Sequence, residues 1–421
     1  MIVLDLPPWI VYPFLFLFGS IVGSFLNVCI YRIPLREEFW PSLKELWDRP
    51  SQCRRCGVGI RWHDNIPIFG WLALRGRCRN CRARISPRYP LIELLTASLF
   101  VVVFWCEAGY GIVTPLESTT TWSPMGPQAV PGLRGMSITT FVLLRYSYHM
   151  VLICGLIVAT FIDFDLQIIP DGATLPVLAV GLFGGVATGC VHLVPVWFEN
   201  RTLFGDSRGM LPEIPGWIMA HPHWHGLAAS VAGVLVGGGM VWGVRILGHW
   251  ALRQEAMGLG DVILMAMMGS FLGWQPMVLV FFLAPACGLV VVIFRWIFIR
   301  ADRVIPYGPY LSLAALLTLL LWPWLWYPAE RYLGAGPVIV PLGAAAMFAL
   351  LTVSLVTARL IKRMLGIADL AEEEPVWTAA DQTFHFSGEQ VDNGQGQWRR
   401  GGWPGGQSGR GQLHVDRWRG R

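Results

Sequence analysis

Long apolar stretches separated by short polar segments dominate the pattern of this chain. A transmembrane helix needs about twenty apolar residues, because it rises 1.5 Å per residue across a hydrocarbon core of roughly 30 Å. The pattern therefore predicts membrane helices at Pro8–Ile30, Pro90–Cys106, Phe141–Ile162, Ala173–Val194, Trp224–Leu247, Val262–Leu272, Met277–Phe298, Leu311–Trp326 and Pro337–Leu360. The sixth is short, so we expect it to lie in a thinned part of the bilayer or to be buried among its neighbours.

The first apolar stretch is interpreted as a membrane helix. A secretory signal would carry basic residues before the apolar run and a small-residue cleavage site after it, and this stretch has neither. Gly19, Ser20, Gly23 and Ser24 place small residues at four-residue spacing, which predicts close packing against another helix.

Basic residues between the stretches indicate orientation. The segment 31–89 holds thirteen Lys and Arg residues, whereas 107–139 holds only Arg134. Since Lys and Arg accumulate in short cytoplasmic segments, we expect the first large loop, Asp163–Asp171 and the turn at Asp261 to be cytosolic. The N-terminus is then expected outside and the C-terminus in the cytosol.

Composition agrees with a membrane protein: 54% of the residues are hydrophobic, 14% are charged, and the mean hydropathy is +0.51. We predict an all-α polytopic membrane protein of about eight or nine transmembrane helices, with a small zinc-knuckle domain inserted between the first two. The expected segments are 1–30 (first helix), 31–89 (cytosolic zinc domain), 90–326 (catalytic membrane domain), 327–365 (an additional helix) and 366–421. The last contains "GQGQWRRGGWPGGQSGRGQ" and is expected to be a disordered cytosolic tail.

Four of the nine cysteines form two C-x-x-C pairs, here called knuckles. The first is "CRRC" at Cys53 and Cys56, and the second is "CRNC" at Cys78 and Cys81. Disulfides are rare in the reducing cytosol, so four thiolates around one structural zinc is the favoured interpretation. The alternative, a redox dithiol, usually stands alone beside a βαβ pattern, which is not visible here.

Acidic residues at the ends of apolar helices are the candidate catalytic groups. An ionised carboxylate at membrane depth is costly, so it tends to be paired, hydrated or functional. Asp163 ends the third stretch and Asp261 begins the sixth, on the same predicted side, as a pair of acids sharing one proton would require. Asp261 could equally serve as a helix N-cap, and Asp171 is interpreted as one. Spacing does not separate Asp163 from Asp165, and ion-coupled transport competes with hydrolysis.

Six blocks in order resemble the bacterial prepilin peptidase (type IV leader peptidase) family, from about Gly19 to Leu320. They are "GSFLNVCIYRIP", "CRRC" followed by "HDNIPIFGWLALRGRCRNC", "ISPRYPLIELLTA", "IDFDLQIIPD", "GLGD" and "IPYGPYLSLAAL". The resemblance implies that Asp163 and Asp261 are the catalytic pair and that Cys53, Cys56, Cys78 and Cys81 are the zinc ligands. It further implies cleavage of the basic leader of prepilin-like or pseudopilin precursors at the cytosolic face of the bacterial inner membrane. N-methylation of the new terminus from S-adenosylmethionine would follow, with Leu72–Arg77 in the region associated with methyl transfer.

Some features depart from the family pattern. Many relatives have Lys two residues after the G-x-G-D aspartate, where this chain has Ile263. The loops 107–139 and 195–222, the ninth helix and the tail are additions. Histidines 192, 221, 223 and 225 are interpreted as surface or interfacial packing rather than metal ligands. A presenilin-like protease or an ion-coupled transporter are the alternatives, but the former needs no four-cysteine domain and the latter should show inverted repeats. The bilayer and precursor proteins are the expected partners, and no specific nucleic acid is expected.

Overall fold

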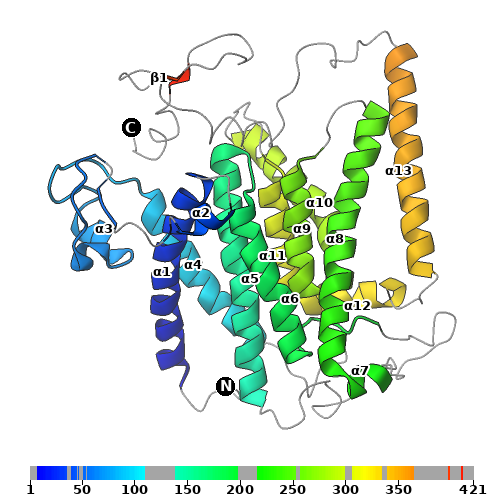
Figure 1. Cartoon of the computed structure of the whole chain (residues 1–421), viewed down its shortest axis with the longest axis horizontal. Helices are drawn as coiled ribbons and strands as arrows, with labels where there is room; N and C mark the ends of the chain where they lie inside the picture. The colour runs from blue at the N-terminus through cyan, green and yellow to red at the C-terminus, as the bar shows by residue number, and fades with distance from the viewer. Residues whose placement is uncertain are drawn as a thin grey trace. The chain divides into compact units, whose positions relative to one another are not determined.

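The computed structural model describes most of the chain and is nearly all helical (Figure 1). The described residues are 7–35, 39–44, 46, 51–53, 55–109, 138–197, 216–252, 257–298, 306–333, 339–364, 397–398 and 409–410. Within them, six helices are long and apolar enough to cross a membrane, and three shorter apolar helices accompany them. Each of the nine predicted stretches therefore has a helical counterpart, and the all-α polytopic prediction is confirmed.

The six long helices of the described chain are α1 (Pro8–Arg32), α4 (Arg88–Phe104), α5 (Ile138–Leu166), α6 (Asp171–Thr188), α8 (Pro222–Leu252) and α10 (Trp274–Phe298). The shorter apolar helices are α9 (Leu259–Leu272), α11 (Gly308–Leu320) and part of α13 (Ile339–Met364). The remaining helical elements are η1 (Ile33–Leu35), α2 (Phe39–Lys44), η2 (Trp62–Asn65), α3 (Phe69–Ala73), η3 (Trp105–Gly109), α7 (Gly216–Ala220) and α12 (Trp322–Leu333).

The chain divides into two compact units. Unit 1 comprises residues 1–5, 103–156 and 174–375, and unit 2 comprises residues 6–102, 157–173 and 376–421. Unit 2 therefore contains α1, the cysteine-rich segment, most of α4, the end of α5 and the beginning of α6. Unit 1 contains the remaining membrane helices.

In unit 2, α1 packs closely against α4 through its small residues. A Cβ added at Gly19 would lie 2.9 Å from the Cα of Ala97, and one added at Gly23 would lie 2.8 Å from the Cα of Glu93. Only glycine permits backbones to approach this closely. The predicted packing role of the small residues in the first helix is thus confirmed.

In unit 1, the short helix α9 is enclosed by its neighbours rather than spanning the membrane alone. Its residues from Leu264 to Leu272 are mostly buried, and α8 packs along it. Gly233 of α8 and Gly269 of α9 are so close that a Cβ on either would meet the other's backbone at about 2 Å. The helix is short because Gly258 is extended at its start and Gly273, with φ +84°, ends it. The second of the two predicted explanations, burial, is the one observed.

Two predicted stretches end differently in the structure. The fourth was expected to reach Val194, but α6 ends at Thr188 because Gly189 adopts φ +71°, and irregular buried backbone follows. The eighth was expected to be continuous, but it breaks at Leu321, where α11 ends and α12 begins. Pro323 explains the break, since proline cannot donate the N–H that a continuous helix needs. The amphipathic α12 then crosses the direction of the other unit 1 helices (Figure 1).

Buried polar side chains join the helices of unit 1. The fully buried His149 on α5 pairs with Glu107 of η3, with 2.5 Å between Nδ1 and Oε1. Two of the histidines predicted to pack at the surface or at an interface are fully buried: His192 contacts Ser230, and His225 donates to the Gly189 carbonyl. The Val196 N–H donates to His225 Nε2, whereas His192 Nδ1 has no hydrogen-bond partner. Both rings are fully buried, so the expected surface position is wrong for these two histidines.

Several sequence-based expectations fall on undescribed residues. They concern Arg134, most of the loops 107–139 and 195–222, and nearly all of the segment 366–421. In that last segment only β1 (Gln397–Trp398) and β2 (Gly409–Arg410) are described, as an antiparallel pair of two residues each.

Candidate metal centre and catalytic acids

The two C-x-x-C segments fold as a repeated backbone turn. In the first, the Cys53 N–H donates to the Val58 carbonyl at 2.9 Å. In the second, the Cys78 N–H donates to the Ala83 carbonyl at 2.8 Å, again five residues further on. An isolated β-bridge closes each turn: Gln52 pairs with Gly59 in the first, and Arg77 pairs with Arg84 in the second. The same turn therefore presents both cysteine pairs.

The fourth residue after each first cysteine has a left-handed backbone. Gly57 has φ +70° and Arg82 has φ +58°, and each N–H donates to the carbonyl of its cysteine. Glycine adopts this conformation at little cost, whereas Arg82 adopts it against its preference. The turn geometry is thus maintained in the second knuckle without the glycine that favours it.

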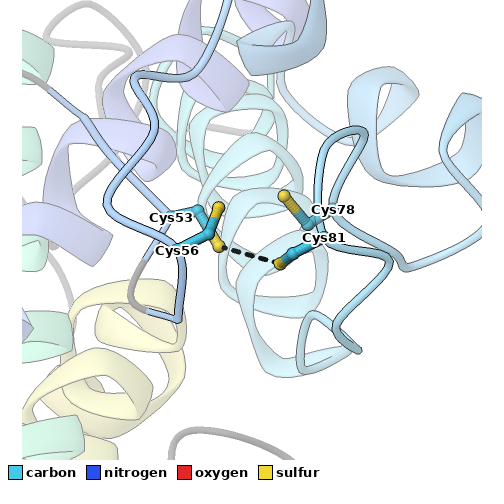
Figure 2. Close-up of side chains that lie close together, drawn as sticks. All are labelled: Cys53, Cys56, Cys78 and Cys81. Carbon is cyan, nitrogen blue, oxygen red and sulfur yellow. Dashed lines mark hydrogen bonds between the residues drawn. The ribbon is translucent and has the colours of Figure 1, made fainter.

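The four sulfur atoms converge from the two turns, which face each other (Figure 2). All four lie within 4.8 Å of one another, and Cys53 Sγ is 3.8 Å from Cys81 Sγ. Zinc bound to thiolates at about 2.3 Å in a tetrahedron requires sulfur atoms roughly 3.8 Å apart. The four residues therefore fit a structural zinc ion, and they are the only such metal-ligand cluster among the described residues.

Backbone amides around the sulfur atoms favour thiolates. The Val58 N–H and the Asn80 amide lower the pKa of Cys56 to about 6, and the Cys81 N–H lowers the pKa of Cys78. Burial instead raises the pKa of Cys53 to about 11. A cation in the centre would favour deprotonation of this last thiol, because metal coordination requires the thiolate.

The segment between the knuckles is tied to the second one. Arg79 donates two hydrogen bonds to the Asp64 carboxylate, at 2.7 Å and 2.5 Å. The guanidinium holds the pKa of Asp64 below its usual range. The Trp71 indole N–H donates to the Ile85 carbonyl at 3.0 Å. These contacts hold the segment between the two cysteine pairs against the second pair.

The structure distinguishes the two aspartates that spacing left equivalent. Asp165 Oδ1 lies 2.5 Å from Nη1 of Arg88, the first residue of α4. The same guanidinium donates to the Phe161 carbonyl at 3.1 Å and lies 5.0 Å from the centroid of the Phe161 ring. Asp163, buried in the last turn of α5, is 4% exposed. Asp165 is thus committed to a salt bridge that braces the turn carrying Asp163.

Asp261 occupies the third position of α9. The N-cap residue is Gly258, whose backbone N–H donates to the Asp261 carboxylate. Asp261 is therefore not the N-cap residue that the sequence offered as an alternative role, and its carboxylate instead accepts from the backbone of the cap residue. Asp171 is the first residue of α6. Asp163 and Asp261 belong to different units, so their pairing stays a prediction.

Sequence reasoning missed three residues of unit 2. Arg88, Glu93 and Asn27 all lie in the blocks quoted above, but each was read as part of a motif without a role of its own. Glu93 could have been found from the sequence. An ionised carboxylate inside an apolar membrane helix has a high free-energy cost, which makes it a candidate functional group. Arg88 and Asn27 have roles only through contacts with residues distant in the chain.

Comparisons with known proteins agree with this architecture. Residues 17–106 match the bacterial peptidase A24 N-terminal domain, and residues 214–293 match the type IV leader peptidase family. The "type 4 prepilin-like proteins leader peptide-processing enzyme" of Escherichia coli O78:H11 is 33% identical over 316 residues, 72% of this chain and 91% of that protein. The "prepilin leader peptidase/N-methyltransferase" of Aeromonas salmonicida is 32% identical over 334 residues, 74% of this chain and 91% of the relative. The protein of that name from Pseudomonas aeruginosa is 30% identical over 72% of this chain and 88% of its own length. No solved structure matches the chain.

Proposed function

Since the chain belongs to the type IV leader peptidase family, we propose that it is a membrane-embedded aspartyl endopeptidase with a second, N-methyltransferase activity. It removes the basic leader from type IV prepilin-like or pseudopilin precursors and methylates the amine that cleavage exposes. The Aeromonas salmonicida relative, whose name gives both activities, aligns with 74% of the chain.

Asp163 and Asp261 are the proposed catalytic pair. Two carboxyl groups sharing one proton divide the work of peptide hydrolysis: the ionised one accepts a proton from water, and the protonated one polarises the scissile carbonyl. The observation that supports Asp163 over Asp165 is the Arg88–Asp165 salt bridge. A guanidinium stabilises the ionised carboxylate, so Asp165 is poorly suited to holding a shared proton.

The four cysteines are proposed to hold zinc in a structural role. A four-thiolate site leaves no coordination position for water or substrate, so the ion would stabilise the knuckles rather than take part in hydrolysis. S-adenosylmethionine is the proposed methyl donor, and it would supply an electrophilic methyl group. Its carboxylate suits the exposed guanidinium groups of the cysteine segment, among them Arg55, Arg61 and Arg84.

The proposed location is the bacterial inner membrane, with the cysteine segment in the cytosol. The excess of Lys and Arg in residues 31–89 supports this orientation. It places the ends of α5 and α9 that carry Asp163 and Asp261 on the cytosolic side, where a basic leader precedes an apolar helix.

The decisive experiment uses the purified full chain in detergent with a synthetic prepilin peptide, with and without S-adenosylmethionine. Mass spectrometry should detect leader release in both reactions and a further methyl group only with the donor. Intact precursor after prolonged incubation would contradict the peptidase assignment, and a released but unmethylated product would contradict the second activity alone.

A further inference from the structure

A cavity of about 1740 Å³ lies in unit 2 between the cysteine segment and the adjoining ends of α1 and α4. Pockets for one small molecule usually enclose about 300–1000 Å³, so this cavity is large enough for two ligands. Its lining differs from one side to the other. Side chains of α1 and α4 form one wall, and the knuckles form the opposite wall.

The helical wall offers a buried acceptor at Asn27. Its Nδ2 donates to the Gly23 carbonyl at 3.2 Å and to the Tyr89 carbonyl at 3.1 Å. Because both partners are carbonyl oxygens, the orientation of the amide is fixed, and Oδ1 must be an acceptor. Asn27 is 5% exposed, and Oδ1 has no hydrogen-bond partner. A buried acceptor left in this state costs about 1–3 kcal/mol, which a ligand that brings an N–H donor would recover.

Glu93 adds a second acceptor to the same wall. The contacts Gly23–Glu93 and Asn27–Tyr89 are successive along the helix pair, one turn apart on each helix. Glu93 is 8% exposed and lines the cavity. It has no basic partner among the described salt bridges, so a cation from outside the chain is the natural counter-charge at this wall.

The backbone beside Glu93 is held in a strained turn. Ile68 has φ +62° and ψ −56°, and the Phe69 N–H donates to the Pro67 carbonyl at 2.6 Å, which defines a γ-turn. In this conformation the Ile68 N–H donates to Glu93 Oε2 at 2.7 Å. A β-branched residue with positive φ costs on the order of 1–3 kcal/mol and is typical of ligand-binding segments. The hydrogen bond that this strained turn presents holds the Glu93 carboxylate at the cavity wall.

The knuckle wall carries the opposite charge. Arginines 55, 61, 79, 82 and 84 line it, and among them Arg79 is neutralised by Asp64. The α1–α4 wall has one arginine, Arg32 at the end of α1, which donates to the Leu46 carbonyl at 3.1 Å. The acceptors Asn27 and Glu93 therefore line the same cavity as several guanidinium groups of the knuckles. A cationic group suits the first wall and a carboxylate suits the second.

We propose that the α1–α4 wall of this cavity binds the free N-terminal amine of the cleaved substrate, with Glu93 and Asn27 as its acceptors. An amine that is followed by an apolar segment matches acceptors flanked by the apolar Ile21, Phe25 and Val28. This inference rests on the proposed methyl transfer. In that step the ammonium first gives a proton to Glu93, and the nitrogen lone pair then forms a bond to the methyl carbon. The carbon–sulfur bond of the donor breaks, its electron pair stays on sulfur, and the protons released pass to solvent.

The test measures amine recognition without any methyl donor. The full chain in detergent is titrated with a dye-labelled apolar peptide of leucine and alanine that has a free N-terminal amine, and with the same peptide N-acetylated. A charge-assisted contact in a buried wall should make the free amine bind at least about tenfold more tightly. In Glu93→Gln this preference should fall to near one, and in Asn27→Leu it should be reduced. Asp171→Asn, a change at the first residue of α6, is the matched control and should keep the full preference.

Glutamine is nearly isosteric with glutamate and its side-chain oxygen can still accept from the Ile68 N–H, so Glu93→Gln should keep its zinc and its unfolding temperature. Equal binding of the two peptides by the unmodified chain, or an unchanged preference in Glu93→Gln, would overturn the proposed amine site. If the chain prefers the free amine but never methylates a cleaved peptide, the methyltransferase proposal is contradicted and the amine site is still supported.

Discussion

Arg88 at the first position of α4 is joined to Asp165 in the last turn of α5, 77 residues further along the chain. The guanidinium also donates to the carbonyl of Phe161 and lies over its ring. Three contacts from one side chain hold both ends of the turn that contains Asp163. The helix then stops, because Gln167 adopts φ +58°. The salt bridge therefore braces this turn through Asp165, which supports the proposal that Asp163 is the catalytic acid.

The first prediction concerns the proposed catalytic acids. Asp163→Asn and Asp261→Asn should each reduce leader cleavage by at least about 100-fold, because an amide can neither activate water nor exchange the shared proton. The pH profile of the unmodified chain should show two apparent pKa values that belong to the pair. Peptide cleavage assays measure both effects.

Asp165→Asn and Asp171→Asn are the controls for this prediction and should keep at least partial activity. All four variants should retain their zinc, and methylation of a pre-cleaved peptide should persist. Full cleavage by Asp163→Asn together with inactive Asp165→Asn would mean that the catalytic role belongs to the other acid.

The second prediction treats Arg88 as a positioning residue. Arg88→Gln should lower kcat for cleavage by roughly 10-fold or more with little change in KM, because it releases the turn without touching the substrate-binding surface. Arg88→Lys should be impaired less, since lysine keeps the positive charge but cannot contact the Asp165 carboxylate and the Phe161 carbonyl as arginine does. In a double-mutant cycle with Asp165→Asn, additive effects would show that the salt bridge does not act as a unit.

The third prediction concerns the metal centre. Elemental analysis of protein purified without chelator should find about one zinc per chain. Cys53→Ser or Cys78→Ser should release it, because the loss of one thiolate opens the tetrahedron and folding of a small metal domain is coupled to binding. Cys29→Ser, at a buried position in α1, is the matched control and should keep the metal. Zinc-free wild-type protein with ordered knuckles would refute the metal assignment.

The fourth prediction concerns the contact of α1 with α4. Gly23→Leu should lower the unfolding temperature and impair both activities, because a side chain there would meet the backbone at Glu93. Overpacking of this kind typically costs about 1–3 kcal/mol. Leu17→Ala is the control on the same helix, where the side chain is 53% exposed and faces away from the packed surface. Equal thermal stability of the two variants would argue against the close contact.

The fifth prediction concerns orientation. A reporter fused after Arg363 should be cytosolic, and one inserted near Gly205 should be outside, if the arginine asymmetry sets the topology. Protease accessibility in inverted and right-side-out vesicles measures this. A cytosolic Gly205 reporter would place the ends of α5 and α9 on opposite sides of the membrane, which is incompatible with a shared catalytic pair.

The sequence by itself determined the local properties of this protein. Apolar length predicts helices because backbone groups in a bilayer can form hydrogen bonds only with one another, and each of the nine stretches contains a helix. Paired C-x-x-C segments predict one metal centre because the turn that presents two sulfur atoms is local, and the four sulfur atoms do converge. The small residues of α1 likewise predict a close helix contact, although not its partner.

Only the tertiary structure decided which side chains act together across long separations in the chain. Asp163 and Asp165 are alike in the sequence, and only the packing of α4 shows that the Arg88 guanidinium forms a salt bridge with Asp165. Glu93 and Asn27 become the wall of a cavity because α1 and α4 meet through glycines. The break at Leu321 and the buried histidines 192 and 225 were also missed. Apolar periodicity reports that a segment is buried, but hydrogen-bond partners depend on distances that only the packed helices fix.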